Sequence, residues 1–331
     1  MKIFKRLGII LLVLILVYFI GPQPSAPHFT NDLPSVPSNA AALEKYIYDG
    51  ESKHKLKPDN NARICWFNDS LKDVTEYALV YLHGFSASQE EGDPVHVSLA
   101  RRFGCNLYLA RLAEHGIDTI DAMINLTAEK LWNSAKEAYT IGKQLGKKVI
   151  LVGTSTGGTL ALKLAAEFPE VAGIILLSPN IAINDPNAWI LNNHWGLQIA
   201  RMIKGKYNIS SDTSALYKKY WYHQYRMEAV VQLEELLENS MKPSLFDKVK
   251  QPTLLLYYYK DKDHEDNVVK VSAMQNMFKQ LGTGPGLKRE VSIPNAGDHV
   301  IGSYIKSKDI KTVQDATAKF MEEIMHLPAR N

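Results

Sequence analysis

The sequence predicts an α/β protein with a mostly parallel central sheet, helices on both faces of the sheet and an inserted helical cap. Short apolar runs alternate with helical patterns, which is typical of parallel strands joined by helices. Several runs are apolar at nearly every position, as strands covered on both faces must be. Between Pro179 and Pro252 the pattern is helical and rich in aromatic residues, which favours a cap over a long structureless loop.

The first 21 residues predict an export or anchoring signal. Residues 1–6 carry three positive charges, and the apolar run LGIILLVLILVYFIG follows over residues 7–21. The run is short for a membrane span, which usually needs roughly twenty residues, but residues 21–27 lack a convincing small-x-small cleavage site. We therefore expect an uncleaved signal anchor, a transmembrane segment, rather than a removed signal peptide.

This segment also predicts a location. The basic end is expected to stay in the cytoplasm by the positive-inside rule, with the rest of the chain on the periplasmic or extracellular face. Cleavage of the segment would make the protein secreted instead. No cysteine directly follows the apolar run, so a lipid-modified cysteine there is excluded.

The rest of the chain predicts a linker and one large domain. Residues 22–41 are rich in Pro, Ser and Asn, which is typical of a linker. Residues 42–331 are expected to form the domain, with its cap at about residues 180–251, and 46% hydrophobic content supplies a large core. Cys65 and Cys105 lie in apolar segments, where either a disulfide or two buried thiols would fit.

Strands and helices are assigned from these patterns. The apolar runs expected to form strands are Ala62–Phe67, Tyr77–Gly84, Cys105–Leu112, Lys148–Gly153, Ala172–Pro179, Pro252–Tyr259 and Lys288–Pro294. The segments expected to form helices are Pro94–Phe103, Ala128–Leu145, Ser155–Phe168, Val269–Leu281 and Lys308–Met325.

Charge and cysteine usage exclude two kinds of site. The formal net charge is only +3, and basic residues are scattered among acidic ones. The sequence therefore has no basic cluster of the kind that binds nucleic acid. It contains no C-x-x-C pair and no cluster of His and Cys, so it predicts no metal site.

A nucleophile is expected at Ser155. The stretch Gly153-Thr154-Ser155-Thr156-Gly157 matches the G-x-S-x-G turn between a strand and a helix. Gly153 and Gly157 supply the space that such a tight turn needs, and the turn exposes the serine hydroxyl at a helix N-terminus. The alternative is that Ser155 only caps the helix.

A serine hydroxyl needs a base and a carboxylate to activate it. His299 is the expected base, because it lies in a turn of Gly, Asp and Asn just after the last strand; the other histidines after Ser155 lie in less suitable places: His194, His223, His264 and His326. The acid should follow the preceding strand. Asp266 is preferred because it precedes Asn-Val-Val and a helix, and Asp263 is the runner-up because of its distance from the strand.

Negative charge on an attacked carbonyl needs donors that are already in place. The expected donors are the backbone N–H groups of Phe85, in the loop after the second strand, and of Thr156, next to the nucleophile. His83 and Gly84 precede Phe85 and are expected to support the turn, with His83 not acting as the base.

On these residues the chain resembles the α/β-hydrolase fold superfamily from about residue 62 to the C-terminus. It is most similar to bacterial carboxylesterase and monoacylglycerol-lipase-like serine hydrolases with a helical cap, through HGFSAS, GTSTGG and the segment Leu109–Tyr139. In that segment His115-Gly116 and Trp132 match the group's L-x-G-H-G turn and tryptophan-bearing helix, whereas Glu114 stands where glycine is usual.

The resemblance implies ester hydrolysis through an acyl-enzyme, with Ser155 as nucleophile, His299 as base, Asp266 as acid and no metal or organic cofactor. A serine nucleophile argues against the haloalkane dehalogenases and epoxide hydrolases of the superfamily, which use aspartate. The substrate is expected to be a small-molecule ester, and an apolar pocket near a membrane would suit acyl or lipid-like esters.

Several alternatives stay open. The same triad serves acyltransferases and amidases, and some relatives cleave carbon–carbon bonds, while a silent binding module would keep only the fold. Aromatic residues of the cap either line an acyl pocket or form its core: Trp189, Trp195, Tyr207, Tyr217, Tyr220, Trp221, Tyr222 and Tyr225. The oligomeric state is not predicted.

Overall fold

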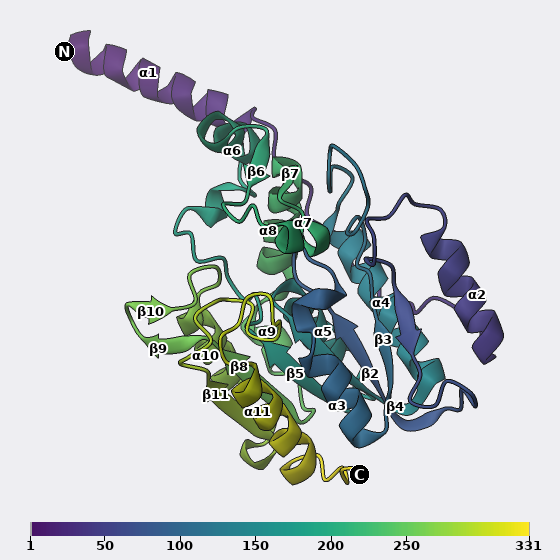
Figure 1. The fold of residues 1–331 in the computed structure, drawn as a ribbon. Coiled ribbons are helices and arrows are strands. Elements are labelled where there is room, and N and C mark those ends of the chain that lie inside the picture. Colours follow the sequence, from purple (N-terminus) through teal and green to yellow (C-terminus); the bar gives the residue numbers. More distant parts are fainter. Residues whose placement is uncertain (1, 331) are drawn as a thin grey trace.

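A seven-stranded sheet forms the centre of the molecule. The computed structural model describes residues 2–330, and the strand order of the sheet is β1-β3-β2-β4-β5-β8-β11 (Figure 1). β1 is antiparallel to β3, and every other neighbouring pair is parallel. The expected mostly parallel α/β sheet is therefore confirmed. All seven strands fall within or overlap the predicted apolar runs: β1 (Arg63–Cys65), β2 (Thr75–Leu82), β3 (Asn106–Leu109), β4 (Gly146–Thr154), β5 (Gly173–Leu177), β8 (Thr253–Tyr257) and β11 (Lys288–Ser292).

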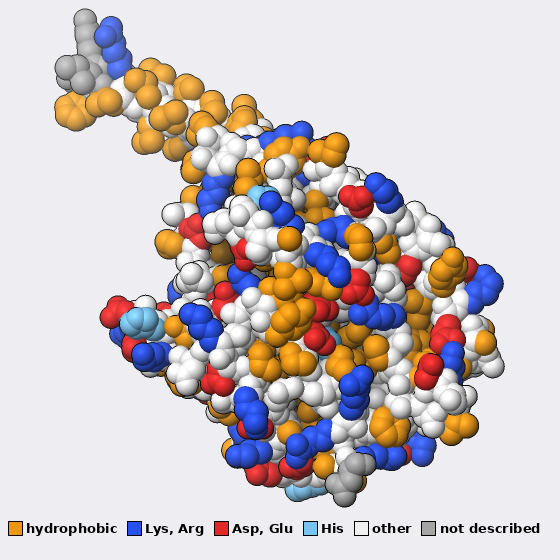
Figure 2. Space-filling view, in the orientation of Figure 1, with side chains coloured by type: hydrophobic (Ala, Val, Ile, Leu, Met, Phe, Trp, Pro, Cys, Tyr) orange, Lys and Arg blue, Asp and Glu red, His pale blue; other side chains and the backbone are white. Residues whose placement is uncertain are grey.

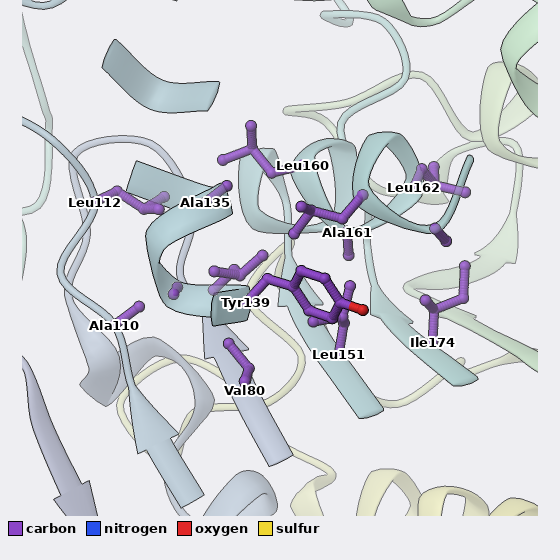
Figure 3. Close-up of a cluster of buried hydrophobic side chains, with 14 of the residues drawn as sticks. Val80, Ala110, Leu112, Ala135, Tyr139, Leu151, Leu160, Ala161, Leu162 and Ile174 are labelled. Atoms are coloured by element: carbon purple, nitrogen blue, oxygen red, sulfur yellow. The ribbon is translucent and has the colours of Figure 1, made fainter. Parts of the chain in front are cut away.

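The strands bury side chains on both faces of the sheet. In β2, Val80 and Leu82 point into one apolar core, while Leu79 and Tyr81 point into the other. The first core includes Tyr139, whose ring packs over Val80 in Figure 3. Because both faces are covered, these strands read as continuous apolar runs with no polar alternation.

Helices cover the two faces. The first core receives side chains from α4 (Ala128–Leu145), α5 (Thr156–Glu167) and α10 (Val271–Gln280), and the second from α3 (Val95–Phe103) and α11 (Ile310–Glu323). Local capping fixes where two of them begin. The Thr127 side chain accepts a hydrogen bond from the N–H of Lys130 at the start of α4. At the start of α11, the Asp309 side chain accepts one from the N–H of Thr312.

The cap is inserted between β5 and β8. Its elements are α6 (Gly196–Lys204), β6 (Tyr207–Ile209), α7 (Ala215–Tyr220), β7 (Gln224–Arg226) and α8 (Met227–Ser240), and α9 (Pro243–Phe246) leads back to the sheet. The cap is mostly helical, as expected, and it also contains an antiparallel pair, β6 and β7, which the sequence analysis did not predict. Each of these strands has three residues, too few for an alternating pattern to be recognised in the sequence.

The N-terminal helix α1 (Lys2–Phe19) projects from the body (Figure 1), and hydrophobic side chains cover much of its visible surface in Figure 2. Its end rests on the cap, where the Trp195 indole N–H donates to the Val17 carbonyl at 3.0 Å. Among residues 2–330, no helix combines the length and the apolarity that crossing a membrane requires. The transmembrane anchor expected for residues 1–21 is thus not supported, since the basic residues occupy the same 18-residue helix as the apolar run.

The segment after α1 is tied to the domain. Residues 22–38 form no helix or strand, but the Thr30 carbonyl accepts from the Trp132 indole at 2.7 Å and from the Lys136 ammonium at 2.8 Å. The side chain of Asn31 also donates to Glu167 at 2.6 Å. This part of the expected linker is therefore fixed along α4 and α5, and α2 (Ala40–Glu51) follows it.

Candidate active site

Ser155 lies at the turn between β4 and α5. Its backbone has φ +51° and ψ −118°, an unusual conformation that costs on the order of 1–3 kcal/mol. A Cβ on Gly157 would lie 1.9 Å from the Leu82 carbonyl oxygen, and one on Gly153 would lie 2.4 Å from the Gly157 carbonyl oxygen. The turn therefore requires glycine at both positions. The Ser155 N–H donates to the Leu177 carbonyl of β5 at 3.0 Å, which holds the turn at the carboxyl end of the sheet.

His299 and Asp266 form a buried pair. His299 follows β11, and its Nδ1 lies 2.6 Å from Oδ2 of Asp266. The other carboxylate oxygen, Oδ1, accepts from the N–H groups of Val268 and Val269 at 2.9 and 3.0 Å. The acid is thus held by the backbone on one side and faces the imidazole on the other.

The alternative acid, Asp263, lies elsewhere. It is exposed, between β9 (Tyr259–Asp261) and β10 (His264–Glu265), and its N–H donates to the Asp261 side chain at 3.0 Å. This hairpin carries Asp263 away from the sheet, and the chain returns so that Asp266 meets His299. The structure therefore brings Asp266, and not Asp263, to the histidine.

Nearby carboxylates favour the protonated form of His299. Burial alone would lower the pKa of this imidazole, but the charge of Asp266 and the hydrogen bond with it outweigh burial. Glu91 and Asp298 act in the same direction, and together they raise the pKa of His299. An imidazole in this setting is suited to accept a proton from a neighbouring group.

Two neutral histidines hold the loop after β2. His83 Nδ1 donates to the Gly84 carbonyl at 2.9 Å, and its Nε2 accepts from the Leu112 N–H at 3.0 Å. His115 Nε2 accepts from the Ser86 N–H at 3.0 Å. Burial lowers the pKa of both imidazoles, that of His115 to about 4. Because each ring nitrogen has a defined donor or acceptor role, the two rings fix the loop geometry.

Phe85 and Thr156 provide backbone N–H groups beside the serine. Thr156 is the first residue of α5, so its N–H has no partner within the helix. Within residues 2–330, the N–H of Phe85 likewise makes no backbone hydrogen bond. Phe85 lines the same cavity as Ser155, and Thr156 directly follows Ser155 in the chain.

The cavity has a volume of about 860 Å³ and lies between the sheet and the cap. Ser155 and His299 both line it. Its apolar lining comes mostly from the cap: Ile183, Ile190, Leu191, Ile199, Ala200, Ile203, Met227, Val230 and Leu233. Of the aromatic residues singled out in the sequence, Tyr217, Trp221 and Tyr225 line it, whereas Trp189 is largely exposed. Some aromatic residues of the cap therefore line the cavity, others belong to its core, and at least one is exposed to solvent.

This geometry agrees with a family comparison. Residues 79–303 match the model of the alpha/beta hydrolase family, a range that includes the end of β2, the Ser155 turn, the cap and His299. The chain belongs to the alpha/beta hydrolase family. The resemblance inferred from the motifs is thereby confirmed, as is the fold class.

Relatives of this family member include lipases and esterases. A thermostable monoacylglycerol lipase of Bacillus sp. (strain H-257) is 32% identical over 108 residues, which are 33% of this chain and 42% of that relative. The match thus spans less than half of the relative's length. A structure from work on the metagenome-derived lipolytic enzymes LipS and LipT has a TM-score of 0.63 at 17% identity, covering 81% of this chain and 99% of its own. Paleococcus ferrophilus monoacylglycerol lipase has a TM-score of 0.55 at 15% identity, covering 80% and 98%. These structures show the shared fold.

One departure from the family pattern has a local explanation. Glu114 stands where glycine is usual, and its φ of +63° is the left-handed conformation that glycine adopts most easily. The Glu114 carboxylate pairs with Lys130 at 2.9 Å, and its carbonyl accepts from the Tyr222 hydroxyl at 3.2 Å. The turn is therefore kept with a different residue, and His115 still reaches the Ser86 N–H.

Sequence reasoning missed one residue of the cavity. Glu91 is only 2% exposed, lies in the short 3₁₀ turn Gln89–Gly92 and accepts a short hydrogen bond from the Gly84 N–H. Burial raises its pKa to about 7, against the opposing effects of that hydrogen bond and of His299. The only signal in the sequence is that Glu91 follows His83 by eight residues. In the sequence, Glu90 and Glu91 look like an ordinary pair of solvent-exposed acids.

The structure also bears on metals and cysteines. Throughout residues 2–330 no group of three or more His, Cys, Asp or Glu side chains is arranged to hold a metal ion. Cys65 and Cys105 are free, with Cys65 partly exposed and Cys105 buried. Of the two possibilities, a disulfide or two thiols, the structure has thiols. Burial raises the pKa of both thiols.

Proposed function

We propose that this protein is a serine hydrolase that cleaves carboxylic esters through an acyl-enzyme. The observation that carries the proposal is that Ser155, at its strained turn, and His299, paired with Asp266, line one cavity. Membership of a family whose relatives include lipases and esterases supports it.

In the proposed reaction Ser155 Oγ attacks the ester carbonyl carbon, and its proton passes to His299 Nε2. The backbone N–H groups of Phe85 and Thr156 stabilise the resulting oxyanion. Collapse of the tetrahedral intermediate breaks the bond to the alcohol, which takes the proton from His299. Water then attacks the acyl-enzyme, with His299 accepting its proton. Collapse of this second tetrahedral intermediate breaks the bond to Ser155 Oγ, which takes the proton back from His299 as the carboxylic acid leaves. Asp266 orients the imidazole and stabilises its charged form.

We further propose a small-molecule ester with an apolar acyl part as the substrate. The apolar lining of the cavity supports this, because a polar substrate would leave its own hydrogen-bonding groups unpaired there. The monoacylglycerol lipase named above points in the same direction. Acyl transfer to another alcohol and amide cleavage remain the alternatives that a substrate panel separates from hydrolysis.

Labelling with a fluorophosphonate probe tests the nucleophile. We expect the intact protein to be labelled and Ser155→Ala to lose both labelling and hydrolysis of p-nitrophenyl esters. Ser98→Ala is the control, because Ser98 lies on α3 and its hydroxyl donates to the Val95 carbonyl within that helix. Labelling of Ser155→Ala at the parental rate would refute the assignment.

A separate proposal concerns location. From the basic and apolar pattern of residues 1–21, we propose that this segment is an export signal and that the hydrolase domain lies outside the cytoplasm. Fractionation of cells expressing the full chain and a chain lacking residues 1–21 tests this. Recovery of both forms only in the cytoplasm would contradict it.

A further inference from the structure

A buried carboxylate beside the serine turn has no part in the Ser155, His299 and Asp266 constellation. Glu91 lines the cavity, and its side chain lies against Gly84, which precedes the oxyanion donor Phe85. A Cβ built on Gly84 would lie 2.8 Å from both carboxylate oxygens of Glu91 and 3.0 Å from Cβ of Ser155. Only the backbone of Gly84 therefore separates this carboxylate from the serine side chain.

The surroundings of Glu91 provide no cationic partner other than the histidine. Among residues 2–330, no lysine or arginine is one of the groups that shift the pKa of Glu91. His299 and Asp298 face it from the loop after β11, and Trp221 lies near it from the cap. Two further titratable groups lie near it: Tyr81 of β2 and Tyr217 of α7.

Burying an acid with so few partners costs stability, and a buried acid that lines a cavity is a candidate for a functional role. Two contacts indicate what the need is here. The hydrogen bond from Gly84 N–H fixes the loop that carries Phe85 N–H, and the charge of Glu91 acts on His299 from a different direction than Asp266 does.

We propose that Glu91 is a positioning residue of the hydrolytic reaction, which holds the Gly84–Phe85 loop against Ser155 and stabilises the imidazolium of His299. This inference rests on the proposed function. When Ser155 Oγ bonds to the carbonyl carbon, its proton moves to His299 Nε2, and Glu91 exchanges no proton in that step. It balances the new positive charge through space, while its link to Gly84 keeps the oxyanion donor in place.

Two variants separate the two effects. Glu91→Gln keeps an oxygen that can accept from Gly84 N–H but removes the charge. Loss of a negative charge weakens His299 as a base, so the acid limb of the pH profile of kcat/KM should shift to lower pH by about half a unit or more. We also expect kcat at pH 8 to fall about tenfold. KM should change little.

Glu91→Asp keeps the charge but shortens the side chain by one methylene. Its acid limb should stay near the parent's while kcat falls, because the Gly84 contact is lost. Glu90→Gln is the matched control: Glu90 accepts from the Tyr304 hydroxyl outside the cavity, so its replacement should leave kcat and the pH profile unchanged.

A parental pH profile and kcat in Glu91→Gln would overturn the inference, as would failure of this variant to fold. A parental kcat in Glu91→Asp would rule out the proposed role of Glu91 in holding the Gly84–Phe85 loop. If Ser155→Ala remained active, the proposed function itself would fail; if Ser155→Ala is inactive and both Glu91 variants behave like the parent, only the role of Glu91 fails.

Discussion

Replacing Glu91 with glutamine is expected to stabilise the protein at pH 8, although it slows the reaction. The pKa of Glu91 rises from 4.5 to about 7 because burial disfavours its charged form. The folded state therefore binds a proton more tightly than the unfolded state, and this group's contribution to the free energy of unfolding falls as pH rises from about 4.5 to 7.

The size of this effect follows from the shift. Each pKa unit corresponds to about 1.4 kcal/mol, so an ionised Glu91 lowers the free energy of unfolding by about 3 kcal/mol at pH 8. Glutamine carries no such charge. The stability difference between Glu91→Gln and the parent should therefore grow by up to about 3 kcal/mol between pH 4 and pH 8.

Urea unfolding of the two proteins at pH 4, 5, 6, 7 and 8 measures the difference. Glu234→Gln is a matched control, because Glu234 on α8 is also buried, has a pKa raised to about 7 and has an Oε2 without a hydrogen-bond partner within residues 2–330. Glu234 does not line the cavity, so its replacement should show the same pH-dependent stabilisation with unchanged kcat.

The reasoning is refuted if Glu91→Gln is less stable than the parent at pH 8, or if the stability difference does not depend on pH. Either result would mean that the carboxylate of Glu91 is kept for the structure of the loop. Gain of stability with loss of rate is the signature of a group retained for function.

Three further predictions follow from the site and its supports. Asp266→Asn should lower kcat about 10³- to 10⁴-fold on p-nitrophenyl esters whereas Asp263→Asn should not, and equal rates would reject Asp266 as the acid. Gly157→Ala should cost about 3 kcal/mol or prevent folding, because its Cβ would lie 1.9 Å from a strand carbonyl; a parental Tm would contradict this. Burial lowers the pKa of His96 and His115 to about 4, so the stability that they contribute is present above pH 6.5 and lost as pH falls toward 4; NMR titration of either imidazole near pH 6.5 would argue against it.

Local patterns were enough for much of the architecture. The central strands of the main sheet lie between helices, so their apolar runs are visible in the sequence without knowledge of their neighbours. The cap was recognised as an insertion, but its β6 and β7 pair was not, since three-residue strands depend on their partner for their structure. The docking of residues 22–38 was also missed, because it depends on contacts to Trp132 and Lys136 about a hundred residues away.

The Ser155 turn could be predicted from local sequence, because steric crowding at a strand-to-helix bend restricts the residues next to it. The sequence also singled out His299 by its place after the last strand. The choice between Asp266 and Asp263 depends on the folded chain, since a two-strand hairpin moves one of these two nearby acids away from the histidine. Glu91 could be recognised only from the folded chain, because its burial and its contacts with Gly84 and His299 join segments that lie far apart in the sequence.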